Sequence, residues 1–118
     1  MSTLKVNDIE EATSGGGKIW PARAWVRFNA QSTLTINESR NVSSMTDYGT
    51  GYYGVSIDND MTDANYVISG MSKDGDSIGA AYEGYFHLTT VLAGSFSVYN
   101  TAQGTADDTD KGCLLVTR

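Results

Sequence analysis

Apolar residues occur at every second position in short segments along most of the chain. In residues 22–29 the apolar positions are Ala24, Val26 and Phe28. The positions that alternate with them are Arg23, Trp25 and Arg27. The same alternation recurs in 33–36, 53–57, 66–68, 86–88, 96–98 and 114–116. Because successive side chains of a strand point to opposite faces, each segment is predicted to be a β-strand with one buried face.

Glycine, asparagine, aspartate and serine separate these segments, which follow one another at a spacing of about 10 residues. Helical periodicity is rare, and only residues 9–12 and 77–81 could form a helical turn. The pattern predicts an all-β protein: an antiparallel β-sandwich of about seven or eight strands, with a jelly-roll or immunoglobulin-like arrangement.

A glycine triplet at residues 15–17 divides the chain into an N-terminal arm with its linker, residues 1–17, and a β-sandwich domain, residues 18–118. The apolar residues of the arm that we single out are Leu4, Val6 and Ile9. They are too few to form a core. The arm is therefore expected either to fray, as chain termini often do, or to dock on its own domain, a neighbouring subunit or a larger assembly.

Length and charge narrow the class of protein. With 118 residues the chain has room for one domain, which can fold without disulfides. Eight Lys and Arg against fourteen Asp and Glu give a net charge of −6 without a basic cluster, so we expect no nucleic-acid partner. The apolar runs are far shorter than the roughly 20 residues of a membrane-spanning helix, and the N-terminus lacks a signal-peptide pattern.

Few residues could support catalysis. The single histidine, His87, is predicted to lie mid-strand on the face of Tyr85 and Thr89, without a nucleophile-elbow motif nearby, and to be an exposed or subunit-contact residue. One histidine and one cysteine cannot supply the ligands of a zinc site. We therefore predict a non-enzymatic protein without a cofactor. A glycan-degrading enzyme that uses two of the carboxylates is the least favoured alternative.

Acidic residues gather in loops. Residues 58–60 with Asp63, and residues 74–76, place oxygen ligands close together as Ca²⁺ prefers. Neither segment has the EF-hand spacing, and Asn and Asp are common turn formers, so we favour ordinary turns and predict no metal site. A third loop, residues 101–112, is predicted to be a solvated acidic loop. Its carboxylates are Asp107, Asp108 and Asp110.

Cysteine and aromatic residues suggest what is buried and what is shared with partners. Cys113 lies in an apolar strand and is predicted to be a small buried residue. Trp25 lies opposite the apolar face of its strand, so either arginine stems shield it or it lies between subunits; we favour a subunit interface made by Arg23, Trp25 and Arg27. Tyr82 and Tyr85 flank a loop of small and polar residues and either pack under it or contact a glycan or a protein partner.

Several blocks of the chain resemble a module of tail-fibre and other virion proteins of tailed bacteriophages. They are Ala24-Trp25-Val26-Arg27-Phe28-Asn29, Asn41-Val42-Ser43-Ser44-Met45-Thr46-Asp47, Gly49-Thr50-Gly51-x-Tyr53 and Asp63-Ala64-Asn65-Tyr66. The resemblance covers about residues 22–70, and residues 4–9 are similar to the start of structural proteins in phages of aquatic bacteria, cyanobacteria among them. The segment 30–32 replaces the usual Gly-containing turn, which leaves the type of the first hairpin turn open.

The resemblance implies a trimeric β-sandwich on the phage particle, made in the host cytoplasm and located on the tail or the capsid surface. We expect a tail-fibre or tail-tip-like component that contacts host surface glycan and other phage structural proteins. The alternative is a capsid decoration or head-fibre (cement) protein. In both cases Leu4, Val6 and Ile9 would anchor the chain, by adding an extended segment to a neighbour and without membrane insertion.

Overall fold

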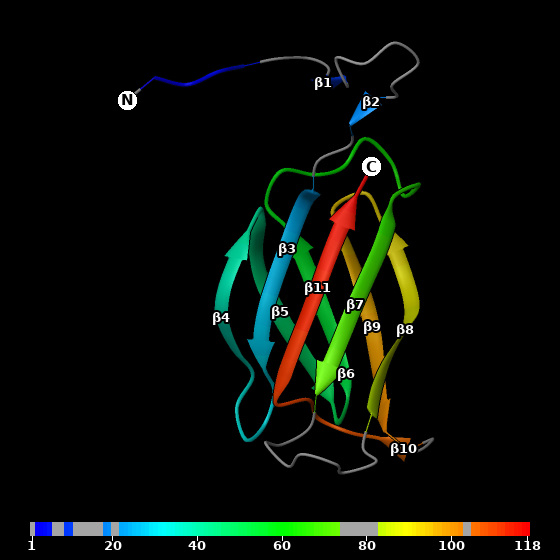
Figure 1. The fold of residues 1–118 in the computed structure, drawn as a ribbon. Coiled ribbons are helices and arrows are strands. Elements are labelled where there is room, and N and C mark those ends of the chain that lie inside the picture. The colour runs from blue at the N-terminus through cyan, green and yellow to red at the C-terminus, as the bar shows by residue number, and fades with distance from the viewer. Residues whose placement is uncertain (1, 6–8, 11–17, 20–21, 74–82, 103–104) are drawn as a thin grey trace.

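The structure is a computed structural model that describes residues 2–5, 9–10, 18–19, 22–73, 83–102 and 105–118 (Figure 1). Every regular element in these residues is a strand, which confirms the predicted all-β class. The strands are β1 (Ile9–Glu10), β2 (Lys18–Ile19), β3 (Ala22–Asn29), β4 (Thr35–Arg40), β5 (Val42–Gly49), β6 (Tyr52–Ile57), β7 (Val67–Lys73), β8 (Glu83–Leu92), β9 (Ser95–Ala102), β10 (Thr105–Ala106) and β11 (Lys111–Thr117).

Two antiparallel layers face each other and form a β-sandwich (Figure 1). One layer has the order β4-β3-β11-β7 and the other the order β8-β9-β6-β5, with β10 added beside β9. β7 and β8 pair only at one end, through Ser72 with Gly84 and Lys73 with Glu83, and this short pairing joins the layers. β1 and β2 pair with each other in a separate small sheet, so Ile9 and Glu10 are in a strand and not in the helical turn that the sequence allowed.

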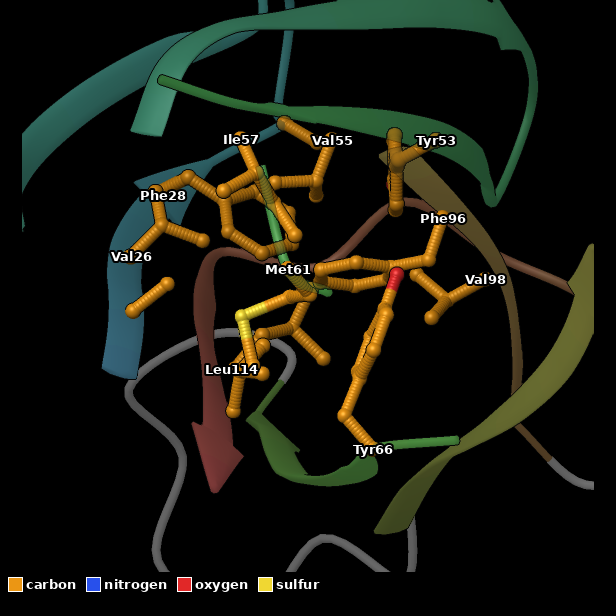
Figure 2. Packing of buried hydrophobic residues seen from close by; sticks show 13 residues of the cluster. Val26, Phe28, Tyr53, Val55, Ile57, Met61, Tyr66, Phe96, Val98 and Leu114 are labelled. Atoms are coloured by element: carbon orange, nitrogen blue, oxygen red, sulfur yellow. The ribbon is translucent and has the colours of Figure 1, made fainter. Parts of the chain in front are cut away.

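The core lies between the layers and contains the inward faces that the alternation predicts (Figure 2). Ala24, Val26 and Phe28 are buried on β3, and the Phe28 ring lies edge-on to Tyr53 with 5.2 Å between the ring centroids. The loop after β6 also contributes, because Met61 turns inward and is 4% exposed. Its backbone N–H donates to the oxygen of Ala93, which fixes this loop over one end of the core.

Two strand predictions required correction. The alternation did not predict β5, an edge strand of its layer. Only Val42 and Met45 of this strand pack against the core, so its apolar residues are too few to show a period of two. Leu88 was expected to face inward with Phe86, yet it is 53% exposed. The register shifts between Leu88 and Thr90, and a bulge of this kind changes which side chains face the core.

The structure also settles the first hairpin turn, between β3 and β4. Ser32 has a φ of 65°, in the left-handed region, so a non-glycine residue takes the place that glycine usually holds. The Asn29 side chain stabilises the start of the turn, because its oxygen accepts a hydrogen bond of 2.8 Å from the backbone N–H of Gln31.

Candidate interaction surfaces

The outer face of the β4-β3-β11-β7 layer carries an exposed surface that we call the Trp25 face. Two side chains from each of β3, β7 and β11 define it: Trp25, Arg27, Ser69, Met71, Cys113 and Leu115. The strand register brings them together, because Leu115 on β11 lies between Trp25 on β3 and Ser69 on β7. The surface therefore crosses three strands that are far apart in the sequence.

Apolar side chains are unusually exposed on the Trp25 face. Met71 is 79% exposed, Leu115 is 39% exposed and the nearby Val67 is 64% exposed, while Trp25 is half-buried. The side chains of the face enclose a shallow depression of about 490 Å³ with mostly apolar walls. Single exposed apolar residues are common on soluble proteins, whereas a contiguous apolar patch marks an interaction site.

Charged residues border the Trp25 face. Arg40 on β4 pairs in register with Trp25, and Glu38 pairs with Arg27, while Arg23 is exposed two positions before Trp25. Tryptophan and arginine are enriched where proteins meet. The three residues predicted as a subunit interface thus lie together on one outer face. The sequence did not reveal their apolar neighbours on β7 and β11, because that proximity depends on the order of the strands.

The prediction that Cys113 is buried is wrong. Leu114 and Val116 point into the core, so the alternation along β11 places Cys113 and Leu115 on the outer face, where both are exposed. A run of four apolar residues does not show which of its two faces is buried. Here one face builds the core and the other contributes to the Trp25 face.

The outer face of the β8-β9-β6-β5 layer carries a different surface, which we call the Tyr48 groove. Its floor and walls include Thr46, Tyr48, Tyr52, Gly54, Thr90 and Ser97. The hollow has a volume of about 250 Å³. Tyr52 lies between two other tyrosines, with ring centroids 5.1 Å from Tyr48 and 6.2 Å from Tyr99. The sequence does not reveal this cluster, because its members come from three strands whose order along the sheet no single segment encodes.

Tyr85 and His87 on β8 do not line the Tyr48 groove. Tyr85 is 59% exposed, and Tyr82 lies outside the described residues, so their contact with a glycan or partner stays a prediction. His87 is exposed, as expected, and its Nε2 atom lies 3.0 Å from the Thr101 hydroxyl. Among the described residues no cysteine or carboxylate joins His87 in a metal-binding group.

The acidic loop before β11 is not simply solvated, which corrects the prediction. Thr109 is fully buried, and the three aspartates around it are partly buried. The Asp108 carboxylate accepts hydrogen bonds of 2.8 Å from the Gly51 backbone N–H and from the Tyr53 hydroxyl. The loop therefore fastens one end of the sandwich, and we call residues 107–110 the aspartate clasp.

Further hydrogen bonds hold the aspartate clasp to both layers. The backbone oxygen of Thr109 accepts from the Ala30 N–H at 2.8 Å, and the Thr109 hydroxyl donates to the oxygen of Lys73 at 3.1 Å. The Asn100 side chain donates to the oxygen of Asp107 at 2.8 Å. Burial, together with the hydrogen bond to Asp108, raises the pKa of the Tyr53 hydroxyl well above its ordinary range.

In the segment considered for Ca²⁺, the Asp63 side chain forms a local turn with Asn65. The Asp63 carboxylate accepts a 2.8 Å hydrogen bond from the Asn65 backbone N–H and two from the Arg118 guanidinium, at 2.8 and 3.2 Å. The Asn65 hydrogen bond and the Arg118 charge hold the pKa of Asp63 below its usual value. Asn59 instead contacts Asn41, to which its backbone N–H donates at 2.7 Å. Residues 74–76 lie outside the described residues.

Residues 2–5 of the arm are exposed. Leu4 is 86% exposed, Ile9 pairs with Ile19 in the small sheet, and Val6 lies outside the described residues. The anchoring role of these residues therefore stays a prediction.

None of the described segments forms a helix with the length and apolar character that crossing a membrane requires. No protein-family model, curated protein or solved structure matches the chain.

Proposed function

We propose that this chain is a non-enzymatic structural protein of a tailed-phage particle, a tail-fibre or tail-tip-like component that assembles with further copies of itself. The sequence blocks within residues 22–70 support the phage assignment through their resemblance to virion modules. The Trp25 face carries the assembly part of the proposal. This face is an exposed apolar depression that combines Trp25 with arginines. Tryptophan and arginine are enriched at protein–protein interfaces, and contiguous apolar patches are uncommon on the rest of a monomer's surface.

Charge complementarity favours a second copy as the partner. The exposed side chains of Arg23, Arg27 and Arg40 gather at the Trp25 face of a chain whose net charge is −6. Another copy offers acidic surface on its other layer, for example the exposed Asp47 on the edge strand β5. A contact between two different patches repeats from copy to copy and closes into a ring when the rotation allows, as in the trimer that the resemblance implies.

Replacing Trp25 with alanine is expected to dissociate the oligomer. Loss of the indole removes the largest side chain of the Trp25 face, and a central interface tryptophan typically contributes about 2 kcal/mol or more, which corresponds to a weakening of about 30-fold. Light scattering coupled to size-exclusion chromatography should give the mass of a trimer for the unchanged chain and a lower mass for Trp25→Ala at the same concentration.

Tyr48→Ala provides the matched control, because it removes an exposed aromatic ring from the outer face of the opposite layer. It is expected to leave the mass of the oligomer unchanged. An unchanged chain that is monomeric at all concentrations would reject self-assembly through the Trp25 face, and so would a Trp25→Ala variant that retains the full oligomeric mass.

Particle location tests the phage assignment and separates it from the capsid-decoration alternative. We expect the chain to copurify with tailed-phage particles in a density gradient, and gold-labelled antibody to mark the tail. Label on the head would instead support a decoration or head-fibre protein. A chain that lacks residues 1–14 is expected to remain with free protein, because the arm carries the anchoring residues Leu4, Val6 and Ile9. Full occupancy by the shortened chain would contradict anchoring by the arm.

A further inference from the structure

We propose that the Tyr48 groove is a binding site for neutral carbohydrate, with Tyr48 as its stacking platform. This groove would make the glycan contact of the proposed function. The proposal rests on that function only for the biological source of the sugar. The site itself follows from the geometry of the β8-β9-β6-β5 layer. It lies on the outer face opposite the Trp25 face, so both surfaces can be occupied at once.

An open aromatic ring lies at the edge of the groove. A Cβ atom added to Gly54 would lie 2.7 Å from Cε2 of Tyr48, so one side of the Tyr48 ring rests on the β6 backbone. Tyr48 is 59% exposed, which leaves the other side of the ring to solvent. Tyr52 packs beside it at 5.1 Å between centroids and limits its movement. The apolar C–H face of a pyranose ring can stack on such a platform, because both surfaces are flat and release water on contact.

Hydroxyl groups surround this platform. Thr46, Ser56, Thr90 and Ser97 line the hollow, and the hydroxyls of Thr89 and Ser97 lie 2.6 Å apart. A hydroxyl can both donate and accept a hydrogen bond, which matches the hydroxyls of a sugar. The volume of about 250 Å³ lies below the roughly 300–1,000 Å³ of sites for drug-sized ligands. The groove therefore suits one sugar ring or a short section of a glycan chain.

The charge of the groove selects the class of sugar. Among the described residues, none with a carboxylate, ammonium or guanidinium group lines it. The net charge of −6 further disfavours an anionic ligand. Neutral hexoses and N-acetylhexosamines fit this environment, whereas uronic acids and sulfated sugars would lack a cationic partner.

The test is calorimetric titration of the full chain with malto-, cello-, manno- and chitohexaose at millimolar concentration, and with hexagalacturonate as an acidic comparison. We expect binding of at least one neutral hexaose and none of the acidic one. Tyr48→Ala should weaken that binding by about tenfold or more, as loss of a stacking surface predicts. Gly54→Ala should also weaken it, because the added methyl group displaces the Tyr48 ring while the rest of the fold is kept.

Leu88→Ala is the matched control, since Leu88 is an exposed apolar side chain on β8 of the same layer, 53% exposed, and lies outside the groove. It should bind as the unchanged chain does, and circular dichroism should confirm that all variants are folded. Absence of binding to every neutral hexaose would overturn the proposal, as would equal affinity of a folded Tyr48→Ala variant. Trp25→Ala separates the two proposals, because it should lose oligomeric mass while each subunit keeps its affinity for the sugar.

Discussion

Phe28→Ala is expected to lower the free energy of unfolding by about 3–5 kcal/mol, the range measured when a buried phenylalanine is truncated. Phe28 is fully buried, and its ring contacts Tyr53 from the opposite layer and Phe86 on β8. A Cβ atom added to Gly112 on the neighbouring strand would clash with the Phe28 ring, so the ring fills the space that this glycine leaves. Its removal would open a cavity where both layers meet, and the rigid strands around it cannot close that cavity.

Urea unfolding followed by tryptophan fluorescence would measure this loss, with circular dichroism to verify that the variant is folded in the absence of urea. Ser44→Ala is a suitable control, because Ser44 is exposed on the edge strand β5 and its replacement should change stability by less than about 0.5 kcal/mol. A loss below about 1 kcal/mol for Phe28→Ala would show that the core is packed more loosely than the structure indicates.

Asp108→Ala is expected to cost about 2–4 kcal/mol, because it removes the acceptor of two hydrogen bonds at once. The Gly51 backbone N–H and the Tyr53 hydroxyl, both in a buried part of the sandwich, would lose their partner. Asp107→Ala is the matched control in the aspartate clasp. Within the described part of the chain, Asp107 makes its hydrogen bonds through its backbone, which the substitution leaves in place.

A pH series gives a second readout of the aspartate clasp. The raised pKa of Tyr53 means that the folded chain retains the phenol proton at a pH where the unfolded chain, with an ordinary pKa of about 10, releases it. Stability should therefore be fully present below about pH 10 and be lost as the pH rises above that value. Asp108→Ala removes one cause of the shift, so its alkaline loss should be shallower. An equally steep loss would show that Asp108 does not act on Tyr53.

The alternation of apolar and polar residues determined much of this fold. It identified seven of the eight long strands, and it placed Phe28 in the core and Trp25 on the outer surface. These features are local, because the two faces of a strand follow from the direction of successive side chains. The alternation did not predict the buried face where a strand has too few apolar residues or has apolar residues on both faces. β5 has too few apolar residues to show its period, and the apolar run around Cys113 has no polar face.

Only the tertiary structure decided which residues meet. The Trp25 face depends on β11 lying between β3 and β7, the Tyr48 groove on β6 lying between β5 and β9, and the aspartate clasp on hydrogen bonds between residues more than 50 positions apart. Strand order follows from the packing of the whole core and from long-range pairing, which no single segment encodes. The sequence alone therefore determined the faces of most strands, and the order of the strands turned those faces into candidate binding surfaces.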